Sequence, residues 1–230
     1  TNPSHPTLRG FDYFYGYTAH RDAHYHYAKL GNRPLYDGFV DVTDQLAKCY
    51  STDLFTARAK KWIVDHHKAH PQQPFFTYLC YTAPHSGLRI PTTSHLTAKG
   101  NYPEEGGLTG GVQWNVDAAN GQINTAKGVI DKGMHPEVAD AVGDDGKPWP
   151  NHARRHATMV RRLDDALADL IQLLVDLDID DDTLIVFTSD NGTLHEGGLD
   201  NVGTYKPDYL DTFGRYDGAK LDQWEGGVRM

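Results

Sequence analysis

Apolar residues recur at helical spacing in two stretches of the chain. The first begins at Ser51, whose hydroxyl is of the type that caps helix N-termini. The residues that follow on one helical face are Leu54, Phe55, Arg58, Trp62 and Ile63. Pro71 and Pro74 come soon after, and proline is poorly tolerated inside a helix. The pattern therefore predicts a helix that is capped by Ser51 and ends before Pro71.

Residues 151–177 carry the clearest helical pattern. The apolar stripe of this stretch consists of Met159, Val160, Leu163, Ala166, Leu167, Leu170, Ile171 and Leu174. Four charged residues lie mostly off the stripe, namely Arg161, Arg162, Asp165 and Asp169. An amphipathic helix turns such a face to water, so the sequence predicts a long helix whose charges are solvated.

Each predicted helix is followed by a short apolar run. Residues 74–82 read PFFTYLCYT, and residues 183–190 read TLIVFTSD. Continuous apolar runs of this length are typical of strands that are buried on both faces of a parallel sheet. In such a run Cys80 is expected to be a buried free thiol. Two successive helix–strand pairs predict the α/β class, with a mainly parallel sheet flanked by helices.

The other stretches show little periodicity. Residues 10–17, GFDYFYGY, are rich in aromatic side chains and predict a loop that lines the core. Residues 20–27, HRDAHYHY, suit either a wet cleft for polar rings such as sugars or an exposed loop. Residues 98–150 are rich in glycine and predict a long excursion, and such loops are usually functional or mobile.

The composition narrows the class of protein. The chain has 230 residues, 39% of them hydrophobic and 23% charged, which is typical of a globular protein with one sizeable core. Its formal net charge of -9 argues against nonspecific nucleic-acid binding. No apolar run reaches the ~20 residues that a membrane-spanning helix needs. The sequence contains no G-x-S-x-G, P-loop, H-E-x-x-H or C-x-x-C motif.

Polar residues follow both predicted strands. His85 comes just after the first, and Asp190 and Asn191 end the second. Ligands of open parallel sheets bind beyond the carboxyl ends of the strands, so these residues share one crevice if the strands are neighbours. A carboxylate and an amide oxygen suit Ca²⁺ or Mg²⁺, although Asp-Asn-Gly is also a common turn signal. His85 suits either an anion contact or a structural role, and Lys220 taken alone would be an ordinary surface lysine.

Four segments together resemble the type I sulfatases, which are formylglycine-dependent members of the alkaline phosphatase superfamily. In the family's order they are RGFDYFYGY, FTYLCYTAPHSG, RRLDDALADLIQLLVDLDIDDDTLIVFTSDNG and GRYDGAKLDQWEGGVR. The resemblance implies an alkaline-phosphatase-like fold in which Asp190 and Asn191 are calcium ligands. It also implies that His85 and Lys220 contact the substrate sulfate. His24 lies where similar carbohydrate sulfatases place polar groups around the substrate.

The resemblance is incomplete in ways that bear on activity. The chain has no Cys/Ser-x-Pro-x-Arg motif, from which the family makes its formylglycine nucleophile. It also lacks the family's first pair of acidic metal ligands and its Gly-Lys-Trp-His segment. We therefore expect residues 1–230 to be the central part of a sulfatase catalytic domain, incomplete at both ends. The nucleophile section would lie upstream, and a C-terminal subdomain downstream.

The whole enzyme implied by this resemblance is a Ca²⁺-dependent sulfuric ester hydrolase. The aromatic and histidine-rich segments favour a sulfated carbohydrate as its substrate, and family habit favours a periplasmic or secreted location. One alternative is a phosphodiesterase or phosphonate hydrolase of the same superfamily. Another is an inactive relative that binds sulfated glycans. None of these readings gives a role to His195.

Overall fold

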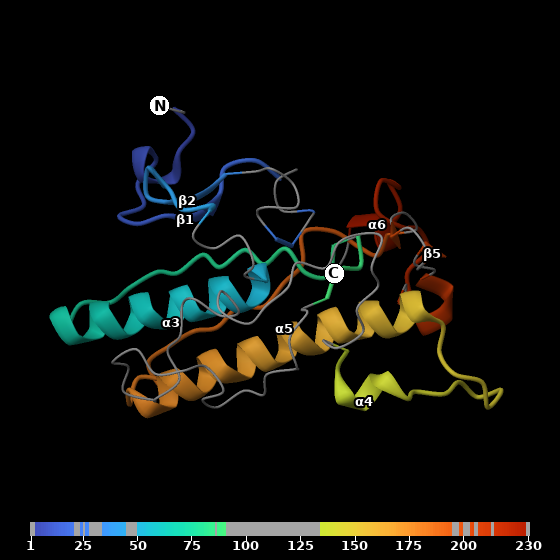
Figure 1. The fold of residues 1–230 in the computed structure, drawn as a ribbon. Coiled ribbons are helices and arrows are strands. Elements are labelled where there is room, and N and C mark those ends of the chain that lie inside the picture. Colours follow the sequence, from blue (N-terminus) through green and yellow to red (C-terminus); the bar gives the residue numbers. More distant parts are fainter. Residues whose placement is uncertain are drawn as a thin grey trace.

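Two long helices form the frame of the structure. The computed structural model of the chain describes residues 3–20, 24, 26–27, 34–44, 50–85, 87–90, 134–194, 198–199, 203–204, 207–212 and 214–228. Helix α3 (Ser51–Ala69) and helix α5 (Asn151–Asp176) lie side by side (Figure 1). Both predicted helices are thereby confirmed, and α5 ends one residue earlier than expected.

Ser51 is the first helical residue of α3 and not its cap. Tyr50 occupies the N-cap position, and no side chain caps the helix there. The Ser51 hydroxyl instead lies 2.7 Å from the hydroxyl of Thr82. The predicted cap is therefore wrong, because this hydroxyl bonds to a group outside the helix.

Apolar side chains pack between the C-terminal halves of the two helices. This buried cluster consists of Ile63, Val64, Leu173, Leu174 and Leu177. Burial of one such side chain contributes about 1.5–3 kcal/mol. Two members of the predicted stripe face outward, since Val160 is 42% exposed and Ile171 is 40% exposed. The stripe prediction is wrong at these two positions, because the partner helix covers a narrower face of α5.

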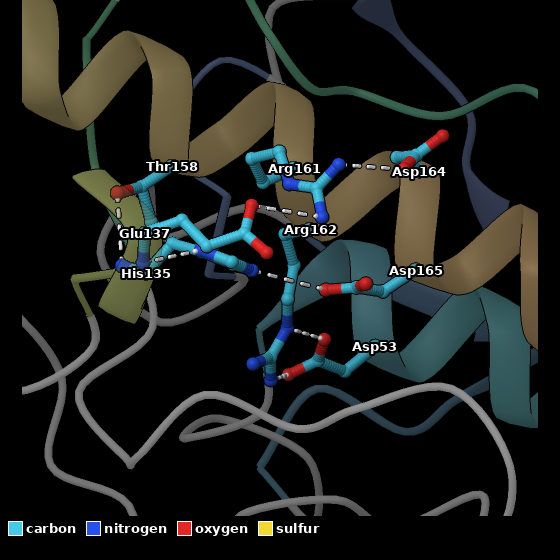
Figure 2. Close-up of polar contacts among 8 residues, drawn as sticks. All are labelled: Asp53, His135, Glu137, Thr158, Arg161, Arg162, Asp164 and Asp165. Atoms are coloured by element: carbon cyan, nitrogen blue, oxygen red, sulfur yellow. Dashed lines mark hydrogen bonds and ion pairs between the residues drawn. The ribbon is translucent and has the colours of Figure 1, made fainter.

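Two buried ion pairs join α3 to α5, and they overturn the prediction that all four charges of α5 are solvated. Arg162 of α5 donates two hydrogen bonds to the Asp53 carboxylate of α3 (Figure 2). Lys60 Nζ lies 2.7 Å from Asp169 Oδ2. All four side chains are buried. Because an unpaired charge inside a protein is costly, these pairs fix how the two helices face each other.

Helix α4 (Pro136–Ala139) is held against α5 by polar contacts. His135 lies at its N-cap, where Nδ1 accepts a hydrogen bond from the backbone N–H of Glu137 at 3.1 Å. Arg161 stays near the surface and lies 3.1 Å from the Glu137 carboxylate (Figure 2). This part of the predicted glycine-rich excursion therefore has local structure. Residues 98–133 lie outside the described residues.

The two apolar runs that follow the helices are extended but form no strand in the described part of the chain. Figure 1 shows both running back along their helices in the same direction. Phe76 is 74% exposed and Leu184 is 89% exposed, so the prediction that these runs are buried is wrong. Cys80 is also exposed, against the prediction. A strand of a parallel sheet needs ladder hydrogen bonds to a neighbouring strand and helices over both faces, and neither run takes part in a ladder among the described residues.

The described strands form two small antiparallel sheets. One contains β1 (Tyr15–Tyr17), β2 (Leu35–Asp37) and β3 (Val40–Asp41), and the other contains β4 (Gly198–Leu199) and β5 (Gly203–Thr204). Strand β1 lies within GFDYFYGY, which was predicted to be a loop. Its Tyr15 and Tyr17 rings each make a T-shaped contact with the Phe55 ring. That segment therefore lines the core, as predicted, but as a strand.

Three short helical turns complete the described elements: η1 (Pro6–Leu8), η3 (Pro207–Leu210) and α6 (Glu225–Val228). Among the helices described, none combines the length and the apolar character that crossing a membrane requires.

We predict that Asp53→Ala lowers the free energy of unfolding by about 3–5 kcal/mol, because it leaves the Arg162 guanidinium buried without its carboxylate. Urea unfolding of the whole protein measures the change. The matched control is Lys61→Ala, which breaks the exposed Lys61–Asp65 pair of the same helix and should cost less than about 1 kcal/mol. An Asp53→Ala loss no larger than this control would contradict the role given to the buried pair.

Candidate functional site

His85 lies just beyond the first extended run, and another predicted residue stacks on it. The His24 and His85 rings are nearly parallel, with centroids 4.0 Å apart and an interplanar angle of 16°. The His20 ring in turn contacts the His24 ring, with the two centroids 5.7 Å apart. The structure thus brings two of the predicted site residues together. Imidazole N–H groups are of the kind that donates to anionic or polar ligands.

Gly87 allows this close approach. Its φ of +107° lies in the region that favours glycine. A Cβ atom at this position would stand 3.2 Å from the backbone oxygen of His24 and 3.0 Å from a guanidinium nitrogen of Arg89. A side chain here would therefore push the His24 segment away from the turn that carries His85.

His26 is a buried member of the same cluster that the sequence reasoning missed. Its Nδ1 lies 3.1 Å from the Thr82 hydroxyl, and its Nε2 lies 3.3 Å from the backbone oxygen of His85. Burial lowers the pKa of His26 to about 3, and the nearby Arg89 adds to the effect. The imidazole is therefore neutral at physiological pH. The only sequence signal was its place in the histidine-rich segment.

Asp190 and Asn191 lie at the end of the second extended run, as predicted. Asp190 is exposed, and Asn191 is partly buried. The Asn191 amide nitrogen donates to the Gly192 backbone oxygen at 3.0 Å, and the Ser189 hydroxyl donates to the Asn191 backbone oxygen at 3.0 Å. These bonds engage the amide nitrogen and leave the side-chain oxygen of Asn191 as the atom suited to a cation.

The segment that carries Lys220 packs on this turn. The backbone N–H of Lys220 donates to the Thr193 oxygen at 2.6 Å, and that of Gly192 donates to the Gly227 oxygen at 3.2 Å. A Cβ atom on Gly226 would lie 2.5 Å from the Gly218 backbone oxygen. The glycines of EGGV are thus needed for close backbone packing, and the structure brings Lys220 beside the Asp190–Asn191 turn.

The first extended run is close enough to Asp190 for an electrostatic effect on its Tyr78 side chain. The pKa of the Tyr78 phenol is raised, first by its hydrogen bond with Cys80 and also by the negative charge of Asp190. The predicted residues fall into two groups, His24 with His85 and Lys220 with the Asp190–Asn191 turn.

The donor set fits a hard cation only in part. A carboxylate and an amide oxygen are suitable ligands for Ca²⁺, which takes 6–8 oxygens. Within the described residues no group of three or more His, Cys, Asp or Glu side chains is arranged to hold a metal ion. These two side-chain oxygens fit at most part of the 6–8 oxygen positions that Ca²⁺ takes.

The chain belongs to the Sulfatase family, whose model matches residues 2–230. This confirms the resemblance noted on the four segments, and with it the α/β class. The chain is 24% identical over 229 residues to Arylsulfatase J of Mus musculus. It is 25% identical over 198 residues to an Arylsulfatase of Klebsiella aerogenes.

These matches cover 97% and 81% of the chain, but 28% and 41% of the two relatives. The chain therefore spans less than half the length of the curated relatives that it matches.

We predict that the protein loses stability as the pH falls below about 6.5, because the unfolded chain takes up a proton on His26 that the folded chain excludes. The loss from this group reaches about 2 kcal/mol near pH 5. His156, whose burial lowers its pKa to about 4, adds to it. Urea unfolding at about pH 7.5 and about pH 5 measures the fall. In His26→Gln the fall should be smaller, and an unchanged fall would contradict the assignment.

Proposed function

We propose that the whole protein hydrolyses sulfate esters and that residues 1–230 are the central part of its catalytic domain. Family membership supports the reaction class. The observation that carries the assignment to residues is the packing of the Lys220 segment on the Asp190–Asn191 turn, together with the stacking of His24 on His85. A cation, an ammonium group and imidazole donors are the groups that a sulfate oxygen needs nearby.

His85 and Lys220 are proposed to hold the sulfate group by donating hydrogen bonds to its oxygens. As the S–O bond of a sulfate ester breaks, negative charge grows on the bridging oxygen. Fixed donors that face this charge lower the barrier, because they are already oriented before the reaction. Lys220 is well suited to such a role, since its backbone is fixed by the hydrogen bond to Thr193.

Asp190 and Asn191 are the proposed calcium ligands of this chain. When bound, Ca²⁺ supplies positive charge beside the sulfate oxygens. The exposed carboxylate of Asp190 and the side-chain oxygen of Asn191 support the proposal. The remaining ligands and the formylglycine nucleophile are assigned to the upstream part of the protein, since this chain contains no Cys/Ser-x-Pro-x-Arg motif.

A sulfated carbohydrate is the proposed substrate, in a periplasmic or secreted enzyme. Small-molecule sites combine ring surfaces with a few placed polar groups, and the His20–His24–His85 row supplies rings with polar nitrogens at the proposed sulfate contact. His24 is the residue proposed to touch the sugar. The curated relatives are named as arylsulfatases, so aryl sulfates are the natural comparison substrates.

Sulfate release by the whole protein tests the proposed residues. Asp190→Ala should abolish most turnover by removing a metal ligand, and Lys220→Ala should lower kcat by about 10²–10³-fold, as for one lost oxyanion donor. Lys147→Ala, at an exposed lysine paired with Asp145, is the control and should leave kcat unchanged. Near-normal kinetics in both site variants would contradict the roles assigned to Asp190 and Lys220.

A substrate panel tests the reaction class. The whole protein should release sulfate from sulfated sugars with a higher kcat/KM than from an aryl sulfate, and it should not cleave a phosphate diester or phosphonate. Preferred release of phosphate would favour the phosphodiesterase reading. Binding of sulfated glycan without any turnover would favour the inactive relative.

A further inference from the structure

We infer that His26 is a positioning residue that holds His85 in place for its contact with the sulfate. This inference rests on the proposed function, since it takes the role of His85 from there. His26 is fully buried, so it does not touch a substrate itself. It acts on the four-residue turn, Thr82 to His85, that ends in the proposed sulfate contact.

The His26 ring bridges both ends of this turn. The turn is closed by a hydrogen bond from the His85 backbone N–H to the Thr82 backbone oxygen at 3.1 Å. Nε2 of His26 faces the backbone oxygen of His85 at 3.3 Å, and Nδ1 faces the Thr82 hydroxyl at 3.1 Å. One rigid imidazole thus fixes the first and the last residue of the turn relative to each other.

The hydrogen bonds have one consistent direction. A backbone oxygen only accepts, so Nε2 of His26 carries the proton. In the neutral ring Nδ1 is then an acceptor and receives the Thr82 hydroxyl proton. The Thr82 oxygen in turn accepts from the Ser51 hydroxyl, which lies 2.7 Å away. The bonds therefore run from the start of α3, through Thr82 and His26, to His85.

The ring is anchored to the helix frame as well. The backbone N–H of Ser51 donates to the His26 oxygen at 2.9 Å, and the His26 ring stacks on Tyr50 at a centroid distance of 5.9 Å. The Tyr50 hydroxyl donates to the Arg89 backbone oxygen at 3.0 Å, beyond the turn. The start of α3 thus holds the chain on both sides of His85.

Two features favour a positioning role over simple filling of the interior. His26 adopts a φ of 58°, a conformation that costs energy for residues with a side chain and often occurs at functional sites. An apolar side chain would fill the same space without needing two polar partners. In addition, His24, two residues earlier, stacks on the His85 ring. One short segment therefore holds both the backbone and the side chain of the same residue.

The test compares His26 with a second buried histidine that makes the same kinds of bond. His5 Nδ1 lies 2.8 Å from the Thr7 hydroxyl, and His5 Nε2 lies 2.9 Å from the Gly38 backbone oxygen. This control holds η1 to the turn between β2 and β3, away from His85. The whole protein is assayed for Tm, for kcat/KM in sulfate-ester hydrolysis, and for the Kd of inorganic sulfate by calorimetry.

We expect His26→Leu to lower kcat/KM by about 10–100-fold and to weaken inorganic sulfate binding, because a misplaced contact loses its alignment. His5→Leu should lower Tm to a similar extent and leave both readouts unchanged. His26→Gln should restore most of the activity, since its amide offers one acceptor and donors to the same two partners. Equal effects of His26→Leu and His5→Leu on kcat/KM would overturn the inference.

Thr82→Val supplies a second route if His26→Leu does not fold. It removes the hydroxyl that bonds to Nδ1, and its control is Thr7→Val, which removes the corresponding partner of His5. Thr82→Val should lower kcat/KM, whereas Thr7→Val should not. The same kcat/KM for the two variants would again overturn the inference.

A double variant separates this inference from the proposed function. If His26 acts through His85, His26→Leu should add little to the loss caused by His85→Ala. Multiplied losses would show that His26 acts elsewhere, and the positioning role would be wrong while the function stands. If His85→Ala itself leaves kcat/KM and sulfate affinity unchanged, the assignment of His85 fails, and the role of His26 fails with it.

Discussion

The buried pairing of Arg162 with Asp53 and of Lys60 with Asp169 is the constraint on which the rest of the structure depends. These pairs fix α3 against α5, and both extended runs leave the C-terminal ends of these helices. Because both runs return along the helices in the same direction, the helix register also decides where the runs end. Three of the candidate site residues, His85, Asp190 and Asn191, lie at those ends.

The start of α3 also holds the segment around His85. Tyr50 and Ser51 bond to residues on each side of His85 and to the His26 backbone. The Asp190–Asn191 turn is held differently, by backbone hydrogen bonds from a distant segment that carries Lys220. One half of the candidate site thus depends on side chains buried beside a helix, and the other half depends on glycines that permit close backbone packing.

Local patterns predicted the two long helices well, because the periodic spacing of apolar residues lies within the helix segment itself. The same patterns failed for Arg162 and Asp169, since the partners that make their burial possible lie 109 residues away in the sequence. The patterns also failed for the apolar runs after the helices. Burial of such a run depends on other segments that pair with it and cover it, and the run's own sequence does not specify them. The proposals for Asp190, Asn191, His85 and Lys220 come from motifs, whereas the proposed role of His26 depends on its contacts with Thr82 and His85.

A crystal structure of the whole protein grown with Ca²⁺ and inorganic sulfate would test the proposed site most directly. We predict a calcium ion bound by the side-chain oxygens of Asp190 and Asn191, with a sulfate in contact with His85 and Lys220. A calcium ion held by other residues, or a sulfate bound away from both His85 and Lys220, would contradict it.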